Sequence, residues 1–493
     1  MQLKTLLAAT PVREIIGPTD RAVESIAYDS RRVQRDGLFV ALRGEKSDGH
    51  DFISQAIEKG AAVIVAERAE KHSRATCVVV ENTRSAMADL AARFYNFPAR
   101  KLKLAAVTGT NGKTTTTFLI KHICEKAGMR CGLLGTVRYE IGERVLPAAR
   151  TTPESLDLQE LLSQISNAGC RGAAMEVSSH ALAQERTRGI EWDVAVFTNL
   201  TQDHLDYHGT MKNYFEAKAK LFEQLAQQQK KKKPVAVINI DDRYGRQLLA
   251  KIDKKVSVVT FGMGASADFR ASNYRMEFAG TSYQLDARGK SYLVRVPLFG
   301  RFNVANSLAA LAAATALGVG LREAVLSLGK SPQVPGRLEI VPAKRQFQVF
   351  VDYAHTPDAL LNVLKTLREL EPRRLIVVFG CGGNRDREKR PLMGQVVDQK
   401  ADYAIITSDN PRKEDPDKII AEVEKGFRGN HFEKITDRAQ AIARSIEIAQ
   451  PRDIVLIAGK GHENYQEFAD HTVPFEDIQV ARRAVENHPV EFK

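Results

Sequence analysis

One octapeptide has the residue types and the order of a phosphate-binding loop. It runs Thr108-Gly109-Thr110-Asn111-Gly112-Lys113-Thr114-Thr115, after an apolar run and before a helical pattern, which is the context such a loop requires. Its glycines allow tight curvature, so backbone N–H groups and the helix N-terminus can face a phosphate. Lys113 supplies a point charge for the outer phosphates, and Thr114 places a hydroxyl where magnesium would sit. We therefore predict a nucleotide site, although two residues separate the glycines where four are usual; the alternative is an ordinary glycine-rich turn with a surface lysine.

Polar residues follow two further strand-like runs. Glu176 ends the run AAME, and His204 lies in NLTQDHLD after the run DVAVF. A carboxylate at the C-terminal end of a parallel strand lies where α/β sheets bind ligands. Taken alone, Glu176 could equally be a metal ligand or a surface residue at a strand end. A lone histidine such as His204 is more often structural. Together with the phosphate loop, they predict a magnesium–nucleotide site.

The elements that position these residues form three α/β blocks. Strand-like runs such as AAVIVAE, LKLAAV and RLIVVFG alternate with helical patterns, which indicates mostly parallel sheets. Between about 268 and 299 the pattern alternates as in hairpins, and a helix is predicted over 303–317. Pro98 with the basic stretch 100–103, and SPQVPG at 331–336, are typical of linkers. We predict domains over residues 1–98, 99–334 and 335–493.

Composition bounds the class of protein. At roughly 150 residues per domain, 493 residues fit three domains, and 43% hydrophobic residues provide enough apolar material to exclude general disorder. No apolar run reaches the ~18–20 residues of a membrane span. The first residues resemble neither a signal nor a transit peptide. Five cysteines without CxxC spacing fit a reduced compartment, so we expect a cytoplasmic protein.

The net charge of +12 admits nucleic acid, a membrane surface or small anionic substrates as partners. The dense run 230–233 is interpreted as a solvated loop. Nucleic-acid recognition would also need an aromatic platform or a reading helix, and the sequence indicates neither. Small anionic substrates are therefore the favoured partners, with no nucleic acid and no membrane insertion.

The motifs TGTNGKTT, MEVSSHAL and NLTQDHLDYHG together resemble the Mur ligase family of peptidoglycan synthesis. GRFNVANSLAA, PGRLE, VDYAHTPDAL, GCGGNRDREKRPLMG, DNPR and GKGHENYQ continue the resemblance in order along the chain. It implies an N-terminal domain for a UDP-sugar, a central ATPase domain with a P-loop-type, mostly parallel sheet, and a C-terminal Rossmann-like domain for an amino acid. ATP and Mg²⁺ are the implied cofactors, and a monomer is expected.

The resemblance also implies roles for single residues. The implied ATP contacts are Gly109, Thr110, Asn111, Gly112, Lys113, Thr114, Thr115, Asn303, Arg337, Asp352 and His355. The implied magnesium ligands are Thr114, Glu176, His204 and Lys218 as a carbamate; Lys113, Lys218, Glu176 and His204 are the implied catalytic residues. From the residues alone, Lys218 is a helix-face lysine, Asn303 part of a helix start, and Asp352 with His355 a strand-end cap.

Contacts to the UDP-sugar dipeptide are implied for Tyr28, Ser30, Glu45, Lys46, Ser47, Arg150, Thr151, Thr152, Ser178, Gln184 and Arg186. Ser30 and Ser47 could equally serve turns. Arg150 stands where many members of the family carry Asn.

The segment Asp409-Asn410-Pro411-Arg412 bears on the incoming amino acid. An arginine can pair bidentately with a carboxylate, and meso-diaminopimelate has a distal carboxylate that lysine lacks. A site with a buried arginine would reject lysine, because its charge would stay unpaired. In the family, DNPR marks the diaminopimelate-adding branch; Arg385, Gly459 and Glu463 are the other implied contacts.

The implied reaction is ATP-dependent ligation of diaminopimelate to the D-glutamate γ-carboxylate of the nucleotide-sugar dipeptide, through an acyl-phosphate. Alternatives are a lysine-adding ligase of the family and a folylpolyglutamate-type ligase, which would share the phosphate loop but not need DNPR. A nucleotide-gated binding protein without ligation need not keep Lys218, Glu176 and His204 together. A basic nucleic-acid protein is the most distant alternative.

Overall fold

The computed structural model describes residues 1–44, 47–229, 233–342 and 345–487. Glu45 and Lys46, predicted to contact the nucleotide-sugar, and Lys230 to Lys232 of the basic run lie outside the described residues. The chain divides into two compact units, one of residues 1–270 with 305–327 and one of 271–304 with 328–493.

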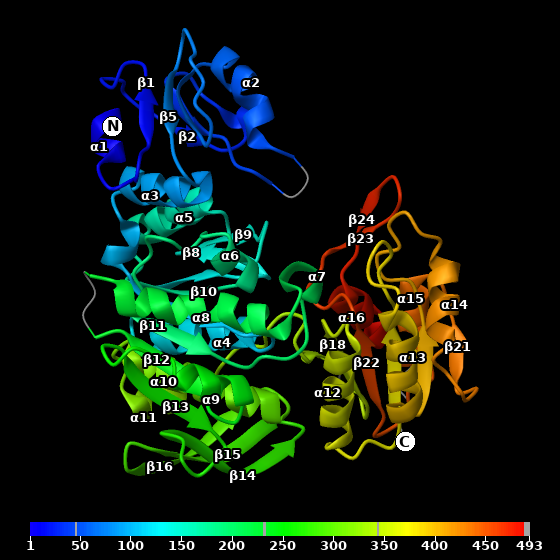
Figure 1. The fold of residues 1–493 in the computed structure, drawn as a ribbon. Helices are drawn as coiled ribbons and strands as arrows, with labels where there is room; N and C mark the ends of the chain where they lie inside the picture. Colours follow the sequence, from blue (N-terminus) through cyan, green and yellow to red (C-terminus); the bar gives the residue numbers. More distant parts are fainter. Residues whose placement is uncertain (45–46, 230–232, 343–344, 488–493) are drawn as a thin grey trace. The chain divides into compact units, whose positions relative to one another are not determined.

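The first sheet is a five-stranded layer with helices on both faces (Figure 1). Only β1 runs antiparallel to its neighbour; the other three pairings are parallel. Leu38 and Val63 pack toward α1 and α3, whereas Phe39 and Ile64 pack toward α2, so every residue of β4 is buried. In sheet order the strands are β1 (Glu14–Ile16), β5 (Thr76–Val79), β4 (Ala61–Ala66), β3 (Gly37–Val40) and β2 (Ile26–Ala27), with α1 (Leu3–Leu7), α2 (Ile53–Glu58) and α3 (Thr83–Phe94).

The central sheet places the predicted phosphate loop. Its core strands are all parallel, in the order β13-β12-β11-β6-β10-β7. Thr108 of β6 pairs with Phe197 of β11, and Val107 pairs with Glu176 of β10. The loops after these three strands therefore leave the same edge of the sheet side by side. The core strands are β13 (Ser257–Gly262), β12 (Val235–Asn239), β11 (Val194–Phe197), β6 (Lys103–Thr108), β10 (Gly172–Glu176) and β7 (Cys131–Leu134).

Five further strands extend this sheet to eleven. β8 (Arg138–Ile141) and β9 (Arg144–Pro147) continue it beyond β7, while β14 (Phe269–Glu277), β15 (Gly280–Ala287) and β16 (Lys290–Val296) follow β13. These last three strands fall in the region where alternation predicted hairpins. The helices are α4 (Lys113–Lys126), α5 (Ser155–Asn167), α6 (Ser179–Ala183), α7 (Leu205–His208), α8 (Met211–Gln227), α9 (Arg243–Leu249), α10 (Arg301–Ala316) and α11 (Leu321–Leu328); α10 matches the predicted 303–317.

The third sheet is parallel apart from β17, with helices on both faces. Leu364, Met393 and Ile420 of α12, α13 and α14 pack on one face, and Ile442 and Ala481 of α15 and α16 on the other. In order the strands are β17 (Glu339–Val341), β18 (Gln348–Asp352), β22 (Ile454–Ala458), β19 (Leu375–Phe379), β20 (Tyr403–Ile406) and β21 (Phe432–Lys434). The helices are α12 (Pro357–Arg368), α13 (Lys389–Lys400), α14 (Pro416–Glu424), α15 (Arg438–Glu447) and α16 (Asp477–Asn487); a hairpin adds β23 (Tyr465–Glu467) and β24 (Thr472–Pro474).

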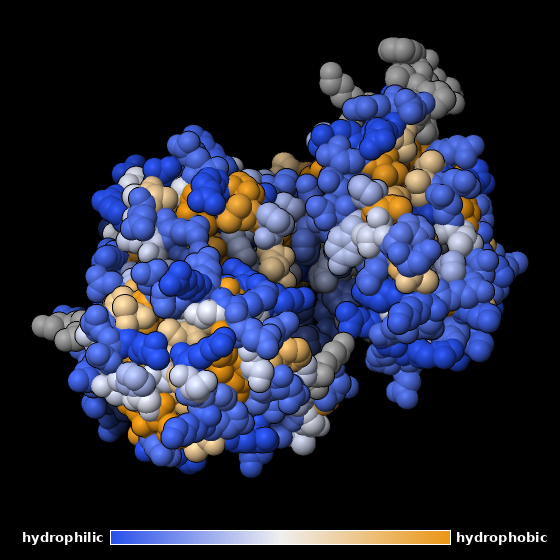
Figure 2. All heavy atoms as spheres, turned by 90° about the horizontal axis from the view of Figure 1, so that it is seen from above, coloured by the Kyte–Doolittle hydropathy of each residue, from blue (hydrophilic) through white to orange (hydrophobic). Residues whose placement is uncertain are grey.

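The predicted α/β class with mostly parallel sheets is thus confirmed. No helix in the described ranges is both long and apolar enough to span a membrane. The face in Figure 2 is mostly hydrophilic, with apolar residues in small groups.

Candidate active site

The phosphate loop spans the end of β6 and the start of α4, and its glycines are required by close approach. Gly109 has φ +148° and Gly112 has φ +85°. A Cβ on Gly109 would lie 1.9 Å from Thr198 Oγ1, and one on Gly112 would lie 2.2 Å from Asn306 Oδ1. No side chain fits at either position without displacing its neighbours. Both glycines are therefore required for the tight curvature that the sequence predicts.

Thr198 and Asn199, which were not among the predicted site residues, hold the loop in shape. Asn111 N donates to Asn199 Oδ1 at 2.9 Å, and Thr110 N donates to the Asn199 carbonyl at 2.9 Å. Thr198 Oγ1 donates to the Asn111 carbonyl at 2.6 Å. The available signal was the polar pair Thr198 and Asn199 directly after β11.

Two lysines reach the carbonyl groups of the loop. Lys113 Nζ donates to the Gly109 and Thr110 carbonyls at 3.0 and 2.7 Å. Lys218 Nζ, from α8, donates to the same Gly109 carbonyl at 2.8 Å and lies 4.6 Å from the centre of the Tyr214 ring. The Lys218 side chain is 1% exposed. Burial, and secondly the Lys113 cation, hold the pKa of Lys218 well below that of an ordinary lysine.

His204 belongs to the same electrostatic neighbourhood. The side chain is 47% exposed. Its partial burial lowers its pKa, and the Lys113 and Lys218 cations lower it further against the opposing effect of Asp203. The imidazole is therefore neutral near pH 7, which is the form that can ligate a metal. Its ring lies 4.9 Å from that of His180, which comes from the segment after Glu176.

Glu176 lies at the end of β10, one strand from β6. It is 1% exposed, and its Oε1 and Oε2 accept from Thr136 N and Oγ1 at 2.9 and 3.0 Å. Gly135 leaves space for the carboxylate, because a Cβ there would lie 2.4 Å from Oε1. Thr136 was not among the predicted residues.

The structure brings together most residues predicted for the dipeptide. Thr152 Oγ1 donates to the Glu176 carbonyl at 2.9 Å and accepts from Ser178 N at 3.0 Å. Arg186 Nη1 donates to the Thr152 carbonyl at 3.0 Å and Nη2 to Gln184 Oε1 at 2.6 Å. Thr151 Oγ1 lies 3.0 Å from Thr136 Oγ1.

Glu154, which was not predicted, organises three arginines. Its carboxylate lies 2.6 Å from Arg150 Nη1, 2.9 Å from Arg186 Nη2 and 3.5 Å from Arg84 Nη1. Glu154 is buried, so one carboxylate faces three guanidinium groups. The excess positive charge suits an anionic substrate.

The remaining residues predicted for the nucleotide-sugar lie in the N-terminal block. Tyr28 OH donates to Asp157 Oδ2 at 2.6 Å, and Ser30 Oγ donates to Gln55 Oε1 at 2.6 Å. Tyr28 also lines a cavity of about 130 Å³ together with Asp157. Ser47 is exposed, and its carbonyl accepts from Gly44 N at 2.9 Å.

Four residues predicted for ATP lie in the unit that does not contain the phosphate loop. Asp352 caps its strand end, since its carboxylate accepts from Leu338 N at 2.7 Å and Ala354 N at 2.8 Å. The Arg337 guanidinium lies 4.9 Å from the Tyr353 ring centre, and the His355 ring lies 4.6 Å from the same ring. Asn303 is buried and donates to the Phe299 carbonyl at 2.8 Å.

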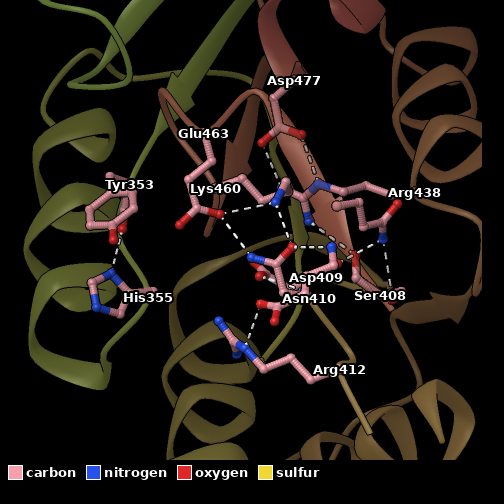
Figure 3. Close-up of polar contacts among 12 residues, drawn as sticks. Tyr353, His355, Ser408, Asp409, Asn410, Arg412, Arg438, Lys460, Glu463 and Asp477 are labelled. Carbon is pink, nitrogen blue, oxygen red and sulfur yellow. Dashed lines mark hydrogen bonds and ion pairs between the residues drawn. The ribbon is translucent and has the colours of Figure 1, made fainter. Parts of the chain in front are cut away.

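The DNPR segment follows β20 and faces the loop after β22 (Figure 3). Asn410 Nδ2 donates to Glu463 Oε2 at 2.9 Å. Gly459 has φ +119°, and a Cβ on it would lie 2.6 Å from Asp409 Oδ2. The buried Pro411 continues the segment, whereas Arg385 is exposed in the turn after β19.

Arg412 is held on two sides. Its Nε donates to Glu467 Oε2 at 2.8 Å, and Nη1 donates to the Gly383 carbonyl at 2.9 Å. The side chain is 20% exposed. Among the residues that the structure describes, these contacts use Nε and one Nη1 hydrogen, so the Nη1–Nη2 edge remains for a carboxylate. Glu467 was not predicted.

Comparisons with known proteins cover the whole chain. The Mur ligase middle domain matches residues 107–314, the "Mur ligase, glutamate ligase domain" 336–461, and the "Mur ligase family, catalytic domain" 22–95. UDP-N-acetylmuramoyl-L-alanyl-D-glutamate–2,6-diaminopimelate ligases of Geobacillus kaustophilus and Geobacillus thermodenitrificans are 47% and 46% identical, each over 98% of this chain and 99% of the relative.

A solved structure of a UDP-N-acetylmuramoyl-L-alanyl-D-glutamate–2,6-diaminopimelate ligase superimposes with a TM-score of 0.72, at 36% identity and 99% coverage of both chains. Folylpolyglutamate synthase of Mycobacterium tuberculosis, at 18% identity and a TM-score of 0.65, covers 82% of this chain and 96% of its own, and shares the fold. The resemblance seen in the motifs is thereby confirmed, and this chain belongs to the Mur ligase family.

Proposed function

We propose that this chain is an ADP-forming ligase that adds meso-diaminopimelate to the D-glutamate γ-carboxylate of UDP-N-acetylmuramoyl-L-alanyl-D-glutamate. The observation that carries the proposal is full-length identity of 41–47% to relatives named for this activity. The held guanidinium of Arg412 supports it, because a distal carboxylate is the group that distinguishes diaminopimelate from lysine.

We assign the UDP-sugar to residues 1–98, ATP to 99–334 and the amino acid to 335–493. Lys113 and the loop around it hold the ATP phosphates, and Asn303, Arg337, Asp352 and His355 serve the rest of the nucleotide. Arg150, Thr151, Thr152, Ser178, Gln184 and Arg186 contact the dipeptide, and Tyr28, Ser30, Glu45, Lys46 and Ser47 the UDP-sugar. Arg385, Asp409, Asn410, Pro411, Arg412, Gly459 and Glu463 receive diaminopimelate.

The reaction consists of two displacements. An oxygen of the γ-carboxylate forms a bond to the γ-phosphorus of ATP while the β–γ bridging P–O bond breaks, which releases ADP and gives an acyl-phosphate. The diaminopimelate amine then attacks the acyl carbon, phosphate leaves, and the amine loses a proton to solvent. Lys113 offsets the negative charge of the phosphoryl group as it moves.

The donor groups near the loop fit Mg²⁺. Thr114 and Glu176 offer hard oxygen ligands and His204 a neutral imidazole. No group of three His, Cys, Asp or Glu in the described residues could hold a metal, which agrees with an ion that keeps waters and binds largely through substrate phosphates. When bound, Mg²⁺ would neutralise phosphate charge. An unmodified Lys218 ammonium would repel it; a carbamate would not.

The function is tested by phosphate release from purified protein with ATP, Mg²⁺ and the nucleotide dipeptide. We expect release that depends on meso-diaminopimelate and is at least tenfold slower with lysine at equal concentration, because lysine has no distal carboxylate to accept hydrogen bonds from Arg412. Equal rates would favour the lysine-adding alternative. ATP binding without amino-acid-dependent release would favour a nucleotide-gated binding protein.

Carbamylation of Lys218 is a second prediction. The lowered pKa leaves the amine neutral at lower pH than usual, and only a neutral amine reacts with CO₂. In bicarbonate, we expect one mass increase equal to CO₂ in the native protein, absent from Lys218→Met and present in Lys212→Met, which changes an exposed lysine on the same helix.

The same site predicts a pH dependence. In CO₂-free buffer the unfolded chain protonates Lys218 below pH ~10.4, whereas the folded chain does so only at lower pH. The unfolded state then binds more protons, so this group makes the fold less stable as pH falls toward 7. Thermal unfolding should show wild type losing stability relative to Lys218→Met over that range; parallel curves would contradict it.

A further inference from the structure

Lys460 is a fully buried lysine between two segments that contribute predicted diaminopimelate contacts. Its side chain is 0% exposed. The Nζ atom lies 3.0 Å from Asn410 Oδ1 in the DNPR segment and 3.0 Å from Glu463 Oε2 in the loop after β22 (Figure 3). A buried ammonium group destabilises a fold unless it is paired and hydrogen-bonded. Here it finds one carboxylate and one amide oxygen.

The three side chains close a ring. Asn410 Nδ2 donates to the same Glu463 Oε2 at 2.9 Å, and Asn410 Oδ1 also accepts from Glu467 N at 3.0 Å. With two donors at Oδ1, only one orientation of the amide satisfies every partner. Two donors occupy Glu463 Oε2, so Oε1 is the oxygen that remains for an ammonium group. Among the described residues, Lys460 is thus the one side chain that contacts both the Asn410 amide oxygen and the Glu463 carboxylate, and it helps to fix the orientation of each.

The surrounding contacts prevent the ring from rearranging. Gln466 Nε2 donates to the Asp409 carbonyl at 2.7 Å. The buried Arg438–Asp477 ion pair, at 2.7 Å, fixes the strand ends on both sides, because Arg438 also donates to the Ala458 carbonyl at 3.0 Å and the Ser408 carbonyl at 3.4 Å. Removal of Lys460 would therefore leave the Glu463 carboxylate, among the residues that the structure describes, with Asn410 Nδ2 as its one hydrogen-bond partner and without a counter-charge within hydrogen-bond distance.

The charges at this site match a zwitterion. Lys460 offsets Glu463, and Glu467 offsets Arg412, at 3.0 and 2.8 Å. Each of the two functional groups thus has one oppositely charged partner within the protein and a remaining edge. The distal end of diaminopimelate carries one ammonium and one carboxylate, which complement Glu463 Oε1 and the Arg412 edge respectively.

We infer that Lys460 is a positioning residue for amino-acid recognition: it holds Glu463 and Asn410 in the geometry that receives the distal ammonium group, without contacting the substrate. This inference rests on the proposed function and deepens it. It assigns a role to a residue that lies, in the chain, between the two predicted contacts Gly459 and Glu463.

The test is Lys460→Met, which keeps the length of the side chain and removes the charge. We expect KM for meso-diaminopimelate to rise about tenfold or more, since small displacements of positioning groups have large effects. The KM values for ATP and nucleotide dipeptide should stay within about twofold, and kcat should change less than KM. Lys413→Met, which removes an exposed lysine three residues from Asn410, should leave all constants unchanged.

A double-mutant cycle separates positioning from general damage. If Lys460 acts through Glu463, Lys460→Met should change KM by no more than about twofold in a Glu463→Gln background. Independent, multiplicative effects would overturn the inference, as would an unchanged KM in Lys460→Met. If Lys460→Met does not fold, Lys460→Gln, which retains a donor, replaces it in the same cycle. A wild type without diaminopimelate-dependent phosphate release would instead refute the proposed function.

Discussion

Lys113→Ala is expected to abolish turnover, with kcat reduced about 10³-fold or more. Lys113 is the first residue of α4, and its ammonium lies over the Gly109 and Thr110 carbonyls at 3.0 and 2.7 Å. The ammonium group therefore lies against the loop whose backbone N–H groups, in our proposal, face the ATP phosphates. A phosphoryl group in transfer spreads negative charge over its oxygens, and a fixed cation next to it stabilises that charge without reorganisation.

The matched control is Lys126→Ala, an exposed lysine in the last turn of the same helix. It removes equal charge and should leave kcat unchanged. Phosphate release under saturating substrates measures both variants, and thermal unfolding establishes that each is folded. Lys113→Ala that retained a tenth of wild-type kcat would contradict the assignment of the loop, because removal of a group that stabilises charge in the transition state lowers kcat about 10²-fold or more.

Local features of the site were predictable, since chain order alone brings them together. The phosphate loop is a strand, a turn and a helix in sequence, and the glycines at 109 and 112 carry the required conformation. The shared location of Glu176 and the segment containing His204 follows from one rule: neighbouring parallel strands end at the same edge of a sheet. The α/β class followed in the same way from alternating strand and helix patterns.

The contacts that required three dimensions were missed. Lys218 was interpreted from the residues alone as a helix-face lysine, yet it is buried under the loop. A signal existed: Tyr214, Leu221 and Phe222 share its face at helical spacing, so the apolar stripe of α8 runs through Lys218. The contacts of Glu154 with Arg84 and of Lys460 with Asn410 had no comparable signal, because the partners lie 70 and 50 residues apart in the chain.

Arg412→Ala should raise KM for meso-diaminopimelate about 100-fold, because truncation of one partner of a hydrogen-bonded charge pair commonly has an effect of that size. Glu467 and the Gly383 carbonyl hold the guanidinium at 2.8 and 2.9 Å, so its Nη1–Nη2 edge is pre-oriented for the distal carboxylate. The KM for lysine, which lacks that carboxylate, should rise much less. The preference for diaminopimelate over lysine should therefore shrink by a factor similar to the rise in KM for diaminopimelate.

Arg412→Lys tests whether charge or shape matters. A lysine keeps the charge but cannot present two parallel donors, so we expect a KM for meso-diaminopimelate between those of wild type and Arg412→Ala. Arg428→Ala, at an exposed arginine of the same domain, is the control for net charge. Because Arg412 also joins the loop of Gly383 to Glu467, a purely structural role would change KM for ATP and diaminopimelate together, or lower the melting temperature without changing the ratio of rates with the two amino acids. A KM effect confined to diaminopimelate, with the selectivity change above, is the result that only recognition of the distal carboxylate explains.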